Sequence, residues 1–133
     1  MATFTECFAS YGAKLPNPQW AVSAIAENGD LVVSCWSLYF SWPDSETRRY
    51  RDRLSRWAGN KNGNRLLRSH LEEALASHRQ VRLVIATPVD RRGVDEGADA
   101  SATKKTFHVE PDEIGVVASF DGDEFVIDFK RNL

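Results

Sequence analysis

Two carboxylates and a lysine in the C-terminal part of the chain have the residue types and spacing for catalytic chemistry. Asp112 follows Pro111 at the start of an expected strand, and Asp128 precedes Lys130 by two residues near the end of the next expected strand. Because alternate side chains of a strand share a face, Asp128 and Lys130 should point the same way. The carboxylates could hold a divalent cation, and the lysine could steady an attacking water or the transition state.

This P-D…D-x-K spacing resembles the pattern of metal-dependent nucleases. The resemblance implies cleavage of nucleic acid with Asp112, Asp128 and Lys130 as catalytic residues. Acidic hairpins also occur as solvated edges of sheets, where their charges serve solubility. We therefore keep nuclease activity as an alternative behind two other functions.

The histidines and cysteines lack the spacing of a metal site. His70 and His78 are eight residues apart on one expected helix, about 12 Å along its axis, which is too far for one metal ion. His108 has no paired Cys or His nearby in the sequence. Cys7 and Cys35 are distant from each other, and Cys35 falls on an expected core face, where thiols are inert. We expect no metal, no cofactor, no disulfide framework and a reduced, cytoplasmic setting.

Charge is divided between two blocks, although the whole chain of 133 residues has a net charge of only −2. The stretch 110–128 has seven acidic residues and no basic one. The stretch 48–70 has one acidic residue, Asp52, and eight basic ones: Arg48, Arg49, Arg51, Arg53, Arg56, Lys61, Arg65 and Arg68. Such a basic block can bind phosphates in a protein of neutral overall charge. Alternatively, the blocks solvate separate faces or neutralise each other inside the fold.

Residues 20–42 predict a β-hairpin around Asn28-Gly29, a dipeptide that suits a two-residue type I′ turn. This turn would place Ile25 opposite Val32. One face of the hairpin would then be almost entirely apolar and face the core: Trp20, Val22, Ala24, Ala26, Leu31, Val33 and Cys35. A slip of one residue would exchange the two faces.

The other face of this hairpin contains the residue most suggestive of ligand binding. In the predicted register Trp36 lies opposite Ala21 and beside Ser34, so small neighbours would leave its ring half covered. A half-covered indole is a candidate stacking platform for a flat ligand such as a nucleobase. Ordinary packing under a helix or loop is the alternative. The aromatic residues expected to join Trp36 in stacking are Tyr39, Phe40 and Trp42.

The remaining pattern indicates the elements that must position these residues. Tyr50, Leu54 and Trp57 form a narrow apolar stripe, which predicts an arginine-rich surface helix from about Glu46 to Trp57. Further expected elements are a helix at Phe4, Phe8 and Tyr11, a helix over Arg65–His78, and strands over Val81–Ala86, Ile114–Phe120 and Glu124–Lys130. The polar, glycine-containing stretch 89–105 is expected to be a mobile surface loop.

A hairpin ending in Ser34-Cys35-Trp36, followed by an amphipathic helix at Arg65–His78 and an apolar strand at Val81–Thr87, resembles the N-terminal modified-cytosine-reading domain of McrA-type endonucleases. The resemblance covers about 60 residues in order and character. It implies that Trp36 stacks on an extruded or unstacked base. It does not imply cleavage, since the HNH nuclease part of that family is absent from these residues.

Together these patterns predict an α+β fold for 1–133 as a single domain. We expect a mixed, mainly antiparallel sheet of five or six strands with two or three helices, mainly on one face. The function favoured is a nucleic-acid-binding module in which the arginine block contacts phosphates and Trp36 stacks on a base. A protein-interaction or inhibitor-type role through the arginine-rich helix is the first alternative. No apolar run is long enough to span a membrane.

Overall fold

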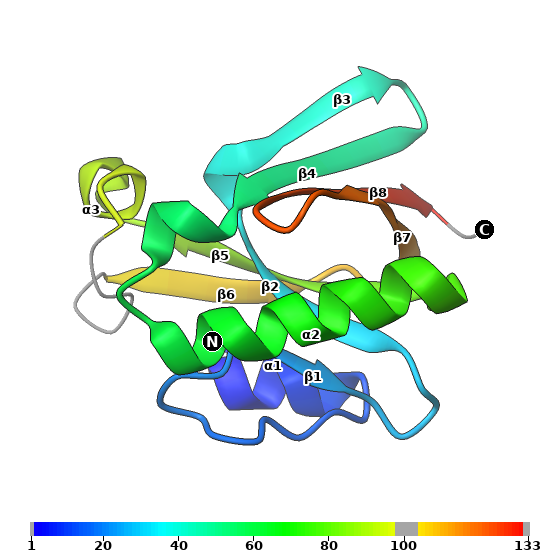
Figure 1. Ribbon diagram of the computed structural model, residues 1–133, viewed down its shortest axis with the longest axis horizontal. Coiled ribbons are helices and arrows are strands. Elements are labelled where there is room, and N and C mark those ends of the chain that lie inside the picture. Colours follow the sequence, from blue (N-terminus) through cyan, green and yellow to red (C-terminus); the bar gives the residue numbers. More distant parts are fainter. Residues whose placement is uncertain (1, 98–103, 132–133) are drawn as a thin grey trace.

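The structure is a computed structural model that describes residues 2–97 and 104–131 (Figure 1). These residues form three α-helices, two short 3-10 helices and eight strands. In chain order the elements are α1 (Phe4–Ser10), β1 (Ser23–Ile25), β2 (Leu31–Trp36), η1 (Ser37–Tyr39), β3 (Phe40–Asp44), β4 (Thr47–Arg53), η2 (Leu54–Trp57), α2 (Lys61–Ser77), β5 (Val81–Pro88), α3 (Arg91–Asp95), β6 (Lys105–Val109), β7 (Glu113–Phe120) and β8 (Glu124–Arg131).

All strands belong to one sheet with the order β1-β2-β5-β7-β8-β4-β3, and β6 pairs with β5 off this path. The β2–β5 pair is parallel, whereas the other pairs are antiparallel. One edge of β5 is shared: its C-terminal half pairs with β6, and Val81 alone pairs with Gly115 of β7. The sheet therefore forks at β5. The α+β class and the mixed, mainly antiparallel sheet are confirmed, with eight strands instead of five or six.

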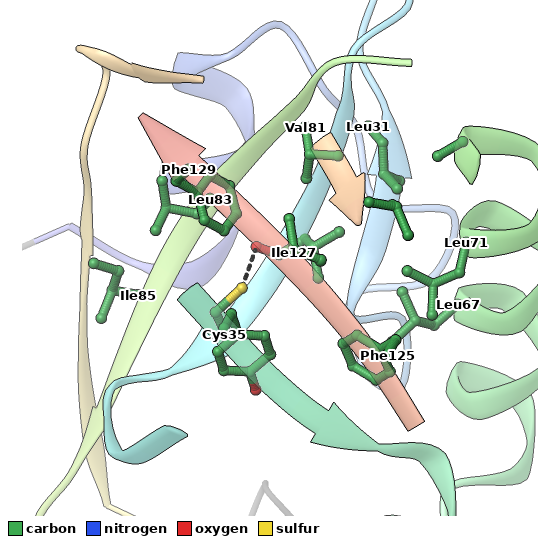
Figure 2. Close-up of a cluster of buried hydrophobic side chains, with 14 of the residues drawn as sticks. Leu31, Cys35, Leu67, Leu71, Val81, Leu83, Ile85, Phe125, Ile127 and Phe129 are labelled. Carbon is green, nitrogen blue, oxygen red and sulfur yellow. Dashed lines mark hydrogen bonds between the residues drawn. The ribbon is translucent and has the colours of Figure 1, made fainter. Parts of the chain in front are cut away.

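Helices α1 and α2 pack on opposite faces of the sheet. Alternate residues of β2 divide between two clusters: Val33 packs with Leu71 of α2, while Val32 packs with Phe8 of α1. Figure 2 shows the first cluster, in which β8 crosses over β5 and Leu67 and Leu71 approach from α2. The helices were expected mainly on one face of the sheet. They pack on both faces because β2 has buried apolar side chains on both of its sides.

The hairpin register differs from the expected one by one residue. Ile25 pairs with Leu31 and not with Val32. The Ala26 amide donates to the Asp30 carbonyl at 2.8 Å, which gives a three-residue loop, and Gly29 alone adopts a positive φ, of 95°. This is the three-residue alternative to a type I′ turn. The slip changes which β1 residues accompany each β2 residue, and both faces of β2 are covered.

The expected helix from Glu46 to Trp57 is wrong. Residues 47–53 form strand β4 and residues 54–57 form the 3-10 helix η2. β4 pairs with β8 over its whole length, with Tyr50 opposite Ile127 and Arg49 opposite Asp128. Because Tyr50 faces the core and its neighbours face outward, the strand period of two describes this segment better than the helical stripe. There is thus no arginine-rich helix at this position.

The other predicted elements are confirmed with shifted ends. Helix α2 begins at Lys61, four residues before the predicted start, because Asn60 is the N-cap and accepts from the Gly63 amide at 3.0 Å. Strands β5, β7 and β8 lie where they were expected. The stretch 89–105 is not a loop throughout, since it contains α3 and the first residue of β6. Its residues 98–103 lie outside the described residues.

Candidate binding site: an aromatic cavity at the end of β2

A cavity of about 860 Å³ lies beside the last residues of β2. Its position follows from the short β1: the pairing of the two strands ends at Ser23 and Val33, whereas β2 continues to Trp36. Trp36 pairs with Ala86 of the parallel strand β5, and both residues line the cavity. The aromatic residues of the lining are Phe4, Trp20, Trp36, Tyr50, Trp57, Phe107 and Phe125.

Trp36 is half-buried and fixed at its backbone. Its amide donates to the Tyr50 hydroxyl at 3.1 Å, and that hydroxyl donates to Asp52 Oδ2 at 3.2 Å. Tyr50 is buried, and this burial raises the pKa of its hydroxyl well above the ordinary value, so it stays neutral. The end of β2 is therefore tied to the inner face of β4 through one protonated hydroxyl.

Asp52 and Arg56 form a buried ion pair in the cavity wall. Arg56 Nε and Nη2 donate to Asp52 Oδ1 and Oδ2, both at 2.8 Å, and the side chains are only 10% and 5% exposed. The Arg53 amide also donates to Oδ1 at 2.8 Å. With the bond from Tyr50, each carboxylate oxygen accepts two hydrogen bonds. Burial opposes the charge of Arg56, yet bonding and attraction to Asp52 outweigh it and raise the pKa of the guanidinium.

The third donor group of Arg56 connects the wall to α3. Arg56 Nη1 donates to the Val94 carbonyl at 2.7 Å, and the guanidinium lies 4.9 Å from the centre of the Tyr39 ring. Tyr39 donates to Asp95 at 2.6 Å. Partial burial, together with the bond to Asp95, raises the pKa of Tyr39 to about 12. Each of the three nitrogen atoms of Arg56 thus donates a hydrogen bond within the protein.

Another part of the wall comes from the segment before β1 and from Asn60, the N-cap of α2. Asn60 Nδ2 donates to the Trp20 carbonyl at 2.9 Å, while Asn60 Oδ1 caps the helix. Gly63 is buried against the same carbonyl, so that a Cβ at this position would collide with it. The missing side chain at Gly63 allows α2 to approach Trp20.

The predicted stacking residues are only partly brought together. Trp36 lines the cavity and Tyr39 lies behind Arg56. Phe40 packs on Tyr50, with ring centres 5.1 Å apart, on the core side. Trp42 is 63% exposed on β3 and lies over Arg48, at 5.6 Å, outside the cavity lining.

Half of the basic block is neutralised by ion pairs with acidic residues. On β4, Arg48 pairs with Glu113 at 3.0 Å, Arg49 with Asp128 at 2.8 Å, and Arg51 with Glu124 at 2.9 Å. Because β4 and β8 are neighbours, the basic and acidic blocks of the sequence meet across the sheet. This arrangement matches the charge-neutralising alternative for those three arginines, whereas Arg56 pairs with Asp52 of its own block.

Four basic residues of the block have no ion pair within the described parts of the chain: Arg53, Lys61, Arg65 and Arg68. The last three are exposed and spaced by four and three residues on α2, which places them on one solvent-facing stripe. Hydrogen bonds from Ser55 lower the pKa of Asp123, and the charges of Arg53 and Arg68 add a smaller decrease. The stripe begins next to Asn60 in the cavity wall.

The residues of the nuclease pattern are not assembled. Asp128 lies opposite Val116, four residues beyond Asp112, a separation of about 13 Å along β7. Asp128 is also held by two bonds from Arg49, at 2.8 and 3.1 Å. Among the described residues, no group of three His, Cys, Asp or Glu side chains could hold a metal ion.

Cys35 and Ser23, two further residues with nucleophilic side chains, are buried. Burial raises the pKa of the Cys35 thiol well above its ordinary value. Ser23 is fully buried and its hydroxyl lies 2.8 Å from His70 Nδ1, joining β1 to α2. Neither residue offers an accessible nucleophile.

Two cavity tryptophans, Trp20 and Trp57, and the acidic partner Asp52 were not predicted as site residues from the sequence. The available signal for Trp20 and Trp57 was the residue type itself, because the chain has only four tryptophans. Trp20 was assigned to the core face, and Trp57 to a helix that does not exist. Asp52 stood out as the single acid of the basic block, a position that suggests an internal ion pair.

The protein has an α+β fold, and its candidate site is an aromatic cavity. The cavity volume lies within the range of ligand-binding pockets, about 300–1,000 Å³. Comparison with models of known families, with curated proteins and with solved structures found no match. None of the described helices combines the length and the apolar character needed to cross a bilayer.

Proposed function

We propose that the protein is a nucleic-acid-binding module that holds one base, in particular a modified base, in the aromatic cavity. The observation that supports this most is the placement of half-buried Trp36 in a cavity with Trp20 and Trp57. Stacking of bases on such rings contributes about 1–3 kcal/mol per base. The cavity is large enough for a base that carries an additional substituent.

Phosphate contacts in this proposal come from the unpaired basic residues and not from the arginines of β4 as a group. Lys61, Arg65 and Arg68 form an exposed stripe that starts at the cavity wall. A strand with one base in the cavity could pass its phosphates along this stripe. Arg48, Arg49, Arg51 and Arg56 then serve the fold through their ion pairs.

Fluorescence anisotropy with labelled DNA and RNA of about twelve nucleotides tests the proposal, at salt concentrations of about 50 and 200 mM. Trp36→Ala should weaken binding by about tenfold, from the loss of one stacked base. Trp42→Ala is the matched control, because this exposed tryptophan lies outside the cavity. It should bind within about twofold of the unmodified protein. Undetectable binding to every oligonucleotide at the lower salt contradicts the proposal.

The basic stripe can be tested separately. Replacing Lys61, Arg65 and Arg68 together by Gln should reduce the slope of log affinity against log salt by about 2 for single strands. The control is Arg49→Gln with Arg51→Gln, which removes two charges that are already paired with acids. An equal loss of slope in the control would show that the stripe has no special role.

Protein binding is a second candidate, favoured by one observation. Trp42 is 63% exposed on the hairpin of β3 and β4, which projects from the rest of the molecule in Figure 1. Exposed tryptophans are enriched among interface residues that contribute strongly to affinity. In that case Trp42→Ala should abolish partner binding while Trp36→Ala leaves it unchanged, the reverse of the outcome for nucleic acid.

A further inference from the structure

The exposed basic stripe of α2, formed by Lys61, Arg65 and Arg68, has a defined length. The three residues lie within about 60° of one another around the helix and cover about 10 Å along its axis. All three are exposed, and none has an ion pair within the described parts of the chain. A strand that runs along this side of the helix can therefore place about three phosphates on basic side chains.

Glu72 ends the stripe. It follows Arg68 by four residues, so it lies on the same side of α2, about 6 Å further along the axis. It is exposed, and within residues 2–97 and 104–131 it has no ion pair. A phosphate placed beyond Arg68 would thus meet an acidic side chain in place of a basic one.

The order of charges along α2 does not serve the helix itself. The helix macrodipole favours acidic residues near the N-terminus and basic residues near the C-terminus. The first turn of α2 contains Lys61 and no acidic residue, whereas Glu72 lies in the C-terminal half and the last turn has no basic residue. An order that opposes the dipole supports a role of the basic stripe in binding an anion.

The stripe starts at the cavity and runs away from it. Trp57, Gly59 and Asn60 line the cavity, and Lys61 follows Asn60 directly as the first residue of α2. A strand with one base in the cavity that continues along this side of α2 would reach Lys61 first. It would then pass the two arginines and meet the carboxylate at the end of the stripe.

From the start, the length and the acidic end of the stripe we infer that the ligand is a short segment of single strand. One base lies in the cavity, and about three phosphates on one side of that base lie along α2 as far as Arg68. Glu72 turns the strand away from the helix and so limits the length that the protein contacts. This inference rests on the proposed function and specifies the ligand of the same site.

Short probes with a single base test the length of the contact. Each probe contains one 5-methylcytosine nucleotide and a run of none to about eight abasic nucleotides on either its 5′ or its 3′ side, so each addition supplies one phosphate and no second base. Competition against a labelled strand of about twelve nucleotides gives the affinities at about 50 mM salt. In one of the two directions the affinity should rise at least about tenfold over the first three phosphates. It should then change by less than about twofold for longer runs.

The variant Glu72→Lys should lengthen the contact, because it adds a fourth cation to the stripe. For the longest probe in the favoured direction, the slope of log affinity against log salt should become steeper by about 0.7, the value for one more phosphate of a single strand. A probe with two abasic nucleotides should keep its slope. Glu46→Lys is the matched control: it makes the same charge change at an exposed position between β3 and β4, away from α2 in Figure 1, and should leave both slopes unchanged.

An affinity that keeps rising with every added phosphate in both directions overturns the inference while leaving nucleic-acid binding in place. Failure of every probe to compete for a labelled strand that does bind has the same meaning, because the protein would then need a longer contact. An equal change of slope in Glu46→Lys and Glu72→Lys also overturns the inference, since net charge alone would explain it. If the unmodified protein does not bind even the labelled strand, the proposed function and the inference fail together.

Discussion

Arg56 and Asp52 face each other through two parallel hydrogen bonds of 2.8 Å, one residue from η2 and the other from the inner face of β4. The same carboxylate receives the Tyr50 hydroxyl, and the same guanidinium reaches the Val94 carbonyl. One buried ion pair thus connects β4, η2 and α3 around the cavity. Its charges are compensated within the wall, which makes it a structural part of the site.

Arg56→Met should destabilise the fold by about 3–5 kcal/mol, because Asp52 would be left buried without its charge partner. Arg51→Met is the matched control on β4: its pair with Glu124 is 57% and 50% exposed, so the expected loss is about 1 kcal/mol or less. Urea unfolding followed by tryptophan fluorescence measures both. Similar small losses in the two variants would mean that the Asp52 pair is open to water.

Tyr50→Phe should keep the ring packing and cost about 1–3 kcal/mol, because the Trp36 amide would lose its acceptor and Asp52 one donor. Tyr39→Phe removes a hydroxyl that bonds to exposed Asp95, and should cost about 1 kcal/mol or less. Urea unfolding again gives the free energies. The result would contradict the structure if Tyr39→Phe proved the more damaging change.

The sequence predicted segments with one dominant period and failed where two periods competed. The leucines of α2 repeat at helical spacing, and the apolar run of β5 is continuous, so both elements were found. In β4, Tyr50 fits both a helical stripe with Leu54 and a strand alternation with Asp52. Strand β8, which lies far away in the sequence, decides for the strand because it pairs with β4 over its whole length and supplies Asp128 and Glu124 as charge partners.

From the sequence, one residue of the candidate site was predictable, whereas the cavity was not. Trp36 was identified from its small neighbours, although the register behind that argument was off by one residue. Its actual surroundings come from Trp20, Trp57 and Phe107, which approach from separate segments. Such an arrangement of residues from distant segments leaves no periodic pattern in a single sequence. The Asp52–Arg56 pair, by contrast, is only four residues apart and can be recognised locally.

His70 should make the stability depend on pH. Burial lowers its pKa from the ordinary value of 6.5; the charge of Glu73 partly opposes this decrease, and the charge of Arg79 adds a smaller one. The unfolded chain therefore takes up a proton at a higher pH than the native protein does. The free energy of unfolding should fall as pH decreases below about 6.5, and this contribution should level off below the native pKa.

The variant His70→Gln isolates this contribution, because glutamine can still approach Ser23 but does not titrate. Urea unfolding at about pH 7.5 and pH 5.5 should show a smaller loss of stability in the variant than in the unmodified protein. An identical loss in both proteins would assign the pH dependence to other groups.

Gly63→Ala should destabilise the protein although alanine is the better helix former by about 1 kcal/mol. A Cβ at Gly63 would collide with the Trp20 carbonyl oxygen, a backbone atom that cannot move without displacing the cavity wall. Gly59→Ala is the control for stability, since no atom lies within 4 Å of a Cβ there. In urea unfolding Gly63→Ala should be clearly less stable than Gly59→Ala, and the oligonucleotide affinity of Gly63→Ala should fall below that of the unmodified protein. A stabilised Gly63→Ala protein with unchanged affinity would show that the close approach of α2 to Trp20 does not shape the site.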